Sequence, residues 1–249
     1  MSSSSTPKIS ACIITKNEEG QIKRCLQSIA WADEIIVIDS GSTDRTVEIA
    51  QELGAKTIHH DWPGWAKQKN YCLDQASHDW ILSLDADEWL EPEAENSIRQ
   101  AVENKEIDSY RLSRKTFFLG RWIAHSGWYP DKQVRLFQKS KTCFEEVPVH
   151  EKVTETASTT DLPLDILHES YTSLEQYMEK SNAYSTAQAK QQAGQSHLML
   201  KLILKPWYRF FQTYLWQKGF LDGREGFILA VSRMYYDFLI IAKIIHSIK

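Results

Sequence analysis

Several features that define common protein classes are missing from this chain of 249 residues. Its four cysteines form no Cys-x-x-Cys pair, so the sequence predicts neither a zinc site nor a disulfide framework. Ten glycines and seven prolines are too few for a low-complexity scaffold. The formal charge of −4 argues against general nucleic-acid binding. Residues 1–6 are polar and contain no apolar signal-peptide core, so we expect a protein that is not secreted.

The composition that is present is typical of a globular protein, with 42% apolar and 25% charged residues. The length suits one large domain, or a domain of about 200 residues with an appendage. We interpret Cys12 and Cys25 as small core residues in a reducing compartment.

Charge is divided unevenly along the chain. Residues 198–249 contain eight Lys or Arg and three Asp or Glu, a net charge of +5, which leaves −9 for the rest. The same residues include eleven aromatic side chains. A basic, aromatic region therefore follows an acidic body.

Apolar runs and helix-spaced segments alternate in the first third of the chain. Strands are expected at 9–14, 34–39, 56–59 and 80–84, with helices between them over 22–29, 43–53 and 66–76. This order indicates a parallel sheet covered on both faces, whose strand-end loops form the ligand crevice. Beyond it we expect helices over 91–104 and 171–192, and shorter strands at 109–113, 117–124, 133–137 and 143–147.

Two carboxylates, Asp85 and Asp87, follow the expected strand over 80–84. Side chains two residues apart in a strand point the same way, and neighbouring carboxylates repel each other unless a cation lies between them. Oxygen ligands suit Mg²⁺ or Mn²⁺, and Mg²⁺ commonly binds through one or two carboxylates plus substrate phosphates. The pair therefore fits a diphosphate site, although an isolated Asp-x-Asp is more often a solvated turn or a helix cap.

Polar residues in three other strand-end loops should meet at the same edge of the sheet. They are Thr15, Asn17 and Glu18, then Asp39, Ser40 and Asp44, then Lys67, Lys69 and Asn70. Each has a structural alternative, because the aspartates could cap a helix and the lysines could form a solvated helix face. The coincidence of these features at strand ends, in this order, favours a site.

Further residues are open to two interpretations. Arg135 could pair with Asp131 or bind phosphate, and Trp62 and Trp65 could be structural or could stack on sugar. The histidines receive no role, because lone histidines are more often structural than catalytic.

In order and spacing, four segments resemble the nucleotide-sugar domain of family 2 glycosyltransferases, over residues 8–151. They are Ile14-Thr-Lys-Asn-Glu-Glu19, Ile38-Asp-Ser-Gly-Ser-Thr-Asp44, Lys69-Asn70 and Leu84-Asp-Ala-Asp-Glu88. A second set resembles the bacterial lipopolysaccharide core β-1,4-glucosyltransferase group: His60–Asn70, Gly127–Asp131, Arg135–Phe137 and Val149–Glu151.

The resemblance implies a GT-A-type α/β fold, with a mostly parallel sheet, helices on both faces and an α-helical C-terminal region. It divides the chain into a disordered tail over 1–7, a nucleotide-sugar-binding catalytic domain over 8–170 and a helical region over 171–249. It also implies an inverting transferase that moves a hexose, most simply glucose, from a UDP-sugar to a lipopolysaccharide core sugar or similar glycolipid. The implied cofactor is Mg²⁺ or Mn²⁺.

The resemblance also assigns roles in binding the donor. Asp39 should meet the nucleobase or ribose, and Thr15 and Glu18 should line the same pocket. The residues expected at the diphosphate and the rest of the nucleotide sugar are Lys69, Asn70 and Arg135.

The metal and the base complete the implied site. Asp87 should ligate the metal directly, with Asp85 on the ribose or on the metal through water. An inverting transfer needs a base for the acceptor hydroxyl. The resemblance places this base at Glu151, with His150 orienting it or touching phosphate. Its rivals are Asp131, Glu145 and Glu146.

Two other classes share part of this pattern. A sugar-phosphate nucleotidyltransferase has the same sheet, but its first loop is normally Gly-rich and bears Arg or Lys, unlike residues 15–19. A catalytically inactive sugar-nucleotide or membrane-surface binding module would not need the Asp85/Asp87 pair or a base. A donor-hydrolysis assay separates the last class from an enzyme.

The C-terminal region contains apolar segments over 198–211 and 227–245. Arg233, Asp237 and Lys243 interrupt the second, and a charge in mid-membrane is costly, so no spanning helix is predicted. Trp and Tyr mixed with Lys and Arg suit the headgroup layer. We expect peripheral binding to the anionic cytoplasmic face of the inner membrane. The alternatives are a helical cap on the catalytic domain and a contact between copies in a homo-oligomer.

Overall fold

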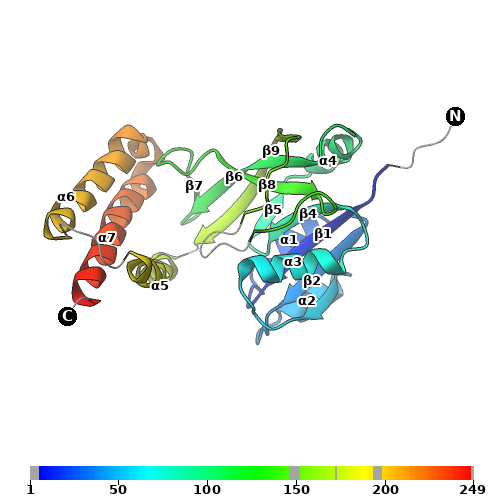
Figure 1. Ribbon diagram of the computed structural model, residues 1–249, viewed down its shortest axis with the longest axis horizontal. Coiled ribbons are helices and arrows are strands. Elements are labelled where there is room, and N and C mark those ends of the chain that lie inside the picture. Colours follow the sequence, from blue (N-terminus) through cyan, green and yellow to red (C-terminus); the bar gives the residue numbers. More distant parts are fainter. Residues whose placement is uncertain (1–5, 146–151, 172, 193–197, 248–249) are drawn as a thin grey trace. The chain divides into compact units, whose positions relative to one another are not determined.

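The computed structural model describes residues 6–145, 152–171, 173–192 and 198–247 (Figure 1). The chain divides into two compact units. Unit 1 comprises residues 1–114 and 131–168, and unit 2 comprises residues 115–130 and 169–249.

Four parallel strands form one half of the sheet in unit 1. Their spatial order is β3 (Lys56–His59), β2 (Glu34–Asp39), β1 (Ile9–Thr15) and β4 (Trp80–Asp85). Every residue of the central β1 is buried. The predicted alternation of strands and helices and the parallel sheet are confirmed.

Helices cover both faces of this half-sheet, as the side chains of β1 show. Ile9, Ala11 and Ile13 join one hydrophobic cluster, whereas Cys12 and Ile14 join a second. This alternation has the strand period of two and explains the continuous apolar runs in the sequence. The first cluster includes side chains from α1 (Ile22–Ser28), α2 (Thr46–Glu52) and α4 (Ala94–Val102), and the second includes side chains from α3 (Trp65–Gln75).

The sheet continues beyond β4 with antiparallel pairings. β8 (Asp131–Gln138) is antiparallel to β4, and β6 (Ser109–Phe118) is antiparallel to β8. β9 (Thr159–Tyr171) and β5 (Glu88–Leu90) follow in the order. The sequence did not indicate these last two strands, because β5 has only three residues and β9 contains Pro163, which argues against a strand.

Two expected strands differ in the structure. The one expected over 117–124 is broken after Phe118, because Leu119 and Gly120 adopt φ of +50° and +79° and turn the chain into β7 (Arg121–Trp122). In place of the strand expected over 143–147 there is a single bridge from Phe144 to Val153. Residues 146 and 147 lie outside the described part of the chain.

Unit 2 is mainly helical, as expected for the C-terminal region. Phe118, Ile123, Tyr177 and Leu229 form its central hydrophobic cluster. The buried Asp222 accepts hydrogen bonds from the backbone and ring of His125, which ties β7 and its following loop to the helices. The helical elements are α5 (Leu174–Gln191), α6 (Leu198–Phe211), η1 (Gln212–Trp216), η2 (Gly219–Asp222) and α7 (Gly223–Ser247).

The α6–α7 pair is closely packed at the turn that joins it. A Cβ on Gly226 would lie 2.0 Å from the carbonyl oxygen of Gly219, so only glycine fits there. Within the described ranges, no helix combines the length and apolarity needed to cross a membrane.

Candidate active site

The carboxyl ends of the parallel strands bring the predicted loops to one edge of the sheet. In the register of the ladders, Thr15 lies beside Asp39, Ile14 beside Asp85, and Asp39 beside His59. The loops that follow these strands therefore start at neighbouring positions, where ligands bind in open α/β sheets.

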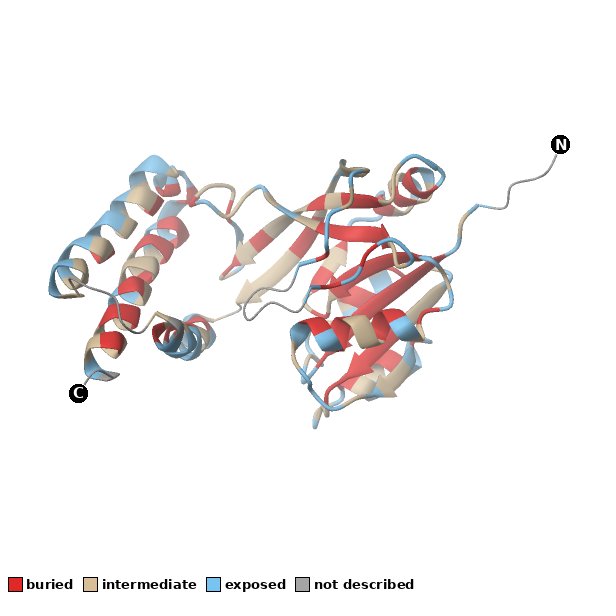
Figure 2. Ribbon diagram, viewed as in Figure 1, coloured by how far each residue is buried: buried red, intermediate tan, exposed pale blue. Residues whose placement is uncertain are grey.

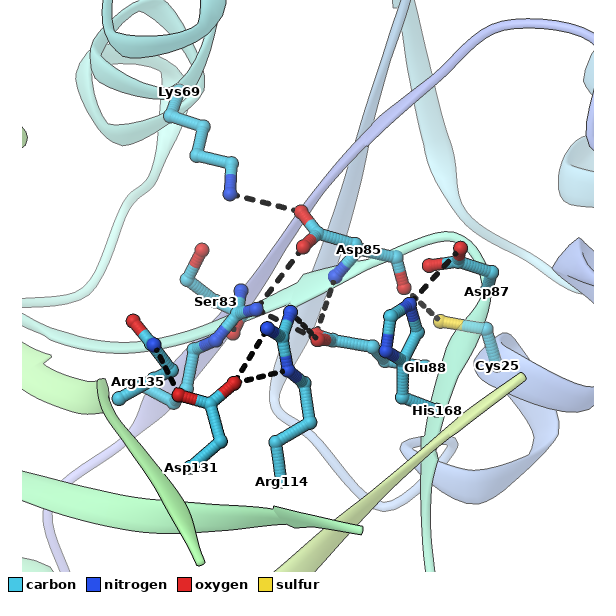
Figure 3. Close-up of polar contacts among 11 residues, drawn as sticks. Cys25, Lys69, Ser83, Asp85, Asp87, Glu88, Arg114, Asp131, Arg135 and His168 are labelled. Carbon is cyan, nitrogen blue, oxygen red and sulfur yellow. Dashed lines mark hydrogen bonds and ion pairs between the residues drawn. The ribbon is translucent and has the colours of Figure 1, made fainter. Parts of the chain in front are cut away.

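Asp85 is held between two cations at this edge (Figure 3). Nζ of Lys69 lies 2.9 Å from its Oδ1, and Nη2 of Arg135 donates to its Oδ2 at 3.0 Å. Both cationic side chains are only 6% exposed. Because buried cations need a counter-charge, Asp85 pairs with both of them, one through each of its oxygens.

The neighbouring Glu88 is fully buried and is also bound to Arg135. Nη2 of Arg135 donates to its Oε1 at 2.7 Å, and the backbone N–H of Asp85 donates to its Oε2 at 3.0 Å. Arg114 lies 3.7 Å from the same Oε1. Asp85, Glu88 and the two arginines therefore form one network across β4, β5, β8 and β6.

The two carboxyl groups of this network differ in their affinity for protons. Burial alone would raise the pKa of Asp85, but Lys69 and Arg135 outweigh it and hold that pKa well below its ordinary value. Burial raises the pKa of Glu88; Arg135 opposes this rise, and the charge of Asp85 adds to it. Glu88 therefore binds a proton more readily than Asp85 does.

A cavity of about 340 Å³ opens beside the network. This volume falls in the range of small-molecule sites. Its lining contains four cationic groups and two carboxylates, an excess that attracts an anion such as a diphosphate. The lining residues are Lys69, Arg114, Arg135, Lys152, Asp85, Asp131, Gln133, Val134, Phe144 and Val153.

Asp131 is bound by residues other than the one considered from the sequence. Arg114 donates to its Oδ2 from Nε at 2.9 Å and Nη2 at 2.5 Å, and Gln133 donates to its Oδ1 at 2.9 Å. Arg114, and not Arg135, is therefore the structural partner of Asp131. Arg135 instead binds Asp85 and Glu88.

Asp87 lies on the turn between β4 and β5. Its side chain is 22% exposed, and its Oδ2 is 3.3 Å from Nε2 of His168 on β9 (Figure 3). His168 received no role from the sequence, and the structure brings it to the predicted metal ligand. The described residues contain no group of three or more His, Cys, Asp and Glu that could hold a metal ion. Among the described residues, Asp87 is therefore the carboxylate at this edge most open to a metal, and Mg²⁺ commonly completes its coordination with substrate phosphates and water.

Asp39 shapes the loop that follows β2. Its carboxylate accepts from the backbone N–H of Gly41 at 2.9 Å and of Ser42 at 3.0 Å. This contact closes the turn after β2 and does not cap α2. Thr15, on the neighbouring strand, has a buried Oγ1 without a hydrogen-bond partner in the described chain. A buried hydroxyl that lacks a partner is costly, so a polar ligand at this edge would satisfy it.

Other predicted residues are also placed by the structure. The backbone N–H of Glu18 donates to Oγ1 of Thr46 at 2.8 Å, which joins the first two loops. Lys67 is exposed, as the solvated-face alternative has it, whereas Lys69 is buried. Asn70 binds the backbone of Phe144 twice, donating to its carbonyl oxygen and accepting from its N–H, each at 2.9 Å. Asn70 therefore holds one wall of the cavity.

The candidate bases are only partly described. His150, Glu151 and Glu146 lie outside the described residues. Glu145 is exposed and accepts from Oγ1 of Thr154 at 3.0 Å.

Besides His168, three charged residues at this site were not predicted: Glu88, Arg114 and Lys152. The acidic run Asp85-Ala86-Asp87-Glu88 could have indicated Glu88, since it directly follows the predicted pair. Arg114 and Lys152 carry no local signal, because strand pairing alone brings them to the cavity.

Comparisons with known proteins agree with this architecture. The chain matches the family described as Glycosyl transferase family 2 over residues 10–150. An uncharacterized glycosyltransferase of Rickettsia bellii is 33% identical, covering 98% of this chain and 88% of that protein. The lipopolysaccharide core biosynthesis glycosyltransferase LpsC of Rhizobium meliloti is 29% identical, covering 97% of this chain and 94% of LpsC.

A solved structure shares the GT-A-type fold over nearly the whole chain. It is S. aureus TarS 1-349 in complex with UDP, with a TM-score of 0.50 and 17% identity, covering 95% of this chain and 89% of that one. The expected α/β fold is thereby confirmed. On its sequence match and on relatives that align over almost its full length, the chain belongs to glycosyl transferase family 2.

Proposed function

We propose that this glycosyltransferase is a metal-dependent, inverting hexosyltransferase. It transfers glucose from a UDP-sugar to a lipopolysaccharide core sugar or a similar glycolipid. The observation that carries the proposal is the cationic cavity at the strand edge, where Lys69 and Arg135 border Asp85. The proposal assigns donor binding and catalysis to residues 8–170 and membrane contact to residues 171–249.

The donor diphosphate suits this cavity because its lining has more cations than carboxylates. Positive groups that are already in place stabilise the charge that develops on the leaving diphosphate. The buried hydroxyl of Thr15, beside Asp39, supports a nucleoside at the adjoining strand ends. Glu18 and Asn70 shape the walls of this site through the contacts described above.

A divalent metal fits the oxygen chemistry of this edge. Asp87 is partly exposed, so it is the residue proposed to hold Mg²⁺ or Mn²⁺. Asp85 would contribute only through water, because its oxygens bind Lys69 and Arg135. When bound, the metal would neutralise the leaving nucleoside diphosphate.

The proposed base is Glu151, assisted by His150. Among its rivals, Asp131 is a poor proton acceptor because Arg114 and Gln133 bind both of its oxygens. Replacing Glu151 with Gln should preserve donor binding and abolish transfer, since the amide keeps the shape but takes no proton. Normal transfer by Glu151→Gln, together with an inactive Glu146→Gln or Asp131→Asn, would identify a different carboxylate.

The acceptor assignment rests on the relative named for lipopolysaccharide core biosynthesis, which aligns with almost the whole chain. A glycolipid acceptor would place the enzyme peripherally at the cytoplasmic face of the inner membrane.

The direct test is to assay purified protein with a panel of nucleotide sugars, with and without Mn²⁺. We expect UDP-glucose to be hydrolysed slowly without acceptor and transferred to isolated lipopolysaccharide core. Full activity in EDTA would contradict the metal role. Binding of UDP-sugar with neither hydrolysis nor transfer would favour the inactive binding module.

A further inference from the structure

The charges that interrupt the apolar sequence of α7 all have polar partners inside unit 2. Asp237 pairs with Lys205 at 3.1 Å and with Arg209 at 2.7 Å, both on α6. Nζ of Lys243 donates to the carbonyl oxygen of Asn182 at 2.8 Å and to further oxygens of α5. Arg233 is half-buried and reaches the carbonyl oxygen of Ser126 at 3.5 Å. None of these charges therefore forms part of an outward polar face.

Helix α6 has the reverse of the ordinary amphipathic arrangement. Two of its three cations, Lys205 and Arg209, bind α7, and Pro206 is its only buried residue. Figure 2 shows α6 coloured mostly as exposed or intermediate. Its large apolar side chains are between 46% and 66% exposed and recur every three or four residues, which places them in one stripe. They are Met199, Leu200, Ile203, Leu204, Trp207, Tyr208 and Phe211.

This stripe continues onto α7. A groove of about 700 Å³, almost entirely apolar, has Ile203 and Trp207 of α6 on one side and Phe227, Tyr235 and Phe238 of α7 on the other. The three α7 residues are themselves 40% to 48% exposed. We call the stripe and these three residues the apolar face. Contiguous exposed apolar surface of this kind marks an interaction site.

The charges around the apolar face indicate which partner covers it. All three acidic residues after position 197 are buried: Asp222, Glu225 and Asp237 are 2%, 5% and 4% exposed. Lys218 and Arg224, at the turn between α6 and α7, are exposed, and Arg224 also pairs with the buried Glu225. Two copies of this surface would bring exposed cations together with no exposed acidic residue after position 197 to pair with them, whereas an anionic lipid headgroup supplies the opposite charge.

We propose that the apolar face inserts into the boundary between headgroups and acyl chains of an anionic bilayer, with α6 lying in the membrane plane. This proposal deepens the proposed function by naming the surface that contacts the membrane. It rests on the proposed function only in assuming that the acceptor is a glycolipid in that membrane. Asp237 holds Lys205 and Arg209 against α7, so these two cations are directed away from the apolar face. We therefore expect apolar insertion to contribute more than electrostatic attraction.

The test is flotation of the full-length protein with vesicles of phosphatidylglycerol and phosphatidylethanolamine. We expect the wild type to float at low and at high salt, because salt screens only the electrostatic part. Leu204→Gln with Trp207→Gln should lower vesicle affinity about tenfold or more, since both side chains lose their insertion into lipid. Gln preserves helix propensity, and circular dichroism checks the fold.

A matched control replaces two exposed apolar residues of unit 1, Leu53→Gln with Trp65→Gln, and should leave flotation unchanged. Charge reversal by Lys218→Glu, which leaves the pair of Arg224 with Glu225 intact, should weaken binding to anionic vesicles more than to zwitterionic ones. Wild-type protein that stays unbound to vesicles would overturn the proposal, and so would a dimer by light scattering that the α6 double variant dissociates. Donor hydrolysis is measured on the same samples, so failure of catalysis and failure of membrane binding are seen separately.

Discussion

Two carboxylates of this protein, one in each unit, each form ion pairs with a lysine and an arginine. In unit 1, Asp85 binds Lys69 and Arg135, whose side chains are 6% exposed. In unit 2, Asp237 binds Lys205 and Arg209, whose side chains are 38% and 35% exposed. The first trio borders a cationic cavity at the end of a parallel sheet, and the second lies within a helix pair whose outer surface is apolar.

An ion-paired carboxylate therefore does not by itself identify a catalytic site. Around Asp85 further polar groups converge, namely Glu88, Arg114 and the partly exposed Asp87, so the trio belongs to a larger charged network. Around Asp237 the ion pairs remove charge from the interior of a helix pair. The same kind of ion pairing therefore forms part of a ligand site in unit 1 and leaves an apolar surface exposed in unit 2.

The largest expected difference between the two trios is in stability. Asp85→Ala removes the carboxylate that the buried Lys69 and Arg135 share, and leaves Glu88 as the carboxylate bound to Arg135. It should lower the free energy of unfolding of unit 1 by about 3–5 kcal/mol. Asp237→Ala should cost at most about 1 kcal/mol, because water reaches Lys205 and Arg209. Urea unfolding of both variants measures the difference. Equal losses in the free energy of unfolding would show that the two trios stabilise their units equally.

The next effect concerns turnover. Asp87→Ala should reduce transfer about a hundredfold or more, because it removes the proposed metal ligand that stabilises developing charge. Its melting temperature should stay near that of the wild type, since Asp87 is partly exposed. The control is Asp61→Ala, which removes a fully exposed carboxylate from the loop after β3. Near-normal turnover by Asp87→Ala would remove the metal role from this residue.

A smaller effect on stability is expected from removing single side-chain hydrogen bonds. Asn70→Ala leaves the N–H and carbonyl of Phe144 without their partner and should cost about 1–3 kcal/mol, with weaker donor binding as the cavity wall loosens. In unit 2, Tyr236→Phe removes one hydrogen bond to Gln188 and should cost about 0.5–1.5 kcal/mol without affecting donor binding. Isothermal titration with UDP distinguishes the two. Unchanged UDP binding in Asn70→Ala would mean that the Phe144 wall does not shape the donor site.

The smallest effect is a pH dependence that should separate Asp85 from Glu88. The pKa of Asp85 is lowered in the folded state, so its stabilisation is present above the unfolded value near 3.9 and is lost as pH falls below it. Asp85→Asn should flatten the stability profile below about pH 4. The pKa of Glu88 is raised, so its contribution has the opposite sign and is lost as pH rises above about 4.3. Glu88→Gln should therefore flatten the profile on that side. Unfolding in urea from pH 3 to 7 checks both, and parallel profiles for both variants would contradict the assignment.

Much of unit 1 could be predicted because its signals are local. Strand runs such as Glu34–Asp39 and Trp80–Asp85 are apolar on both faces, and loops at strand ends must meet at one edge. The prediction of one continuous strand over 117–124 was wrong, because the left-handed backbone of Leu119 breaks that strand. No residue before Gly120 is of a type that predicts a turn there. The roles of individual residues were harder to predict. Arg135, for example, could equally well have paired with Asp131 or bound phosphate.

By itself, then, the sequence determined the alternation of elements, the edge at which polar residues gather and the family to which the chain belongs. Only the tertiary structure decided which cation binds which carboxylate, because Arg135 and Asp85 meet through the pairing of β8 with β4 across 50 residues of chain. It also decided which face of α6 points outward. Helical spacing defines two faces of a helix, but the position of Asp237 on α7 selects the charged face for the interior and leaves the apolar one exposed.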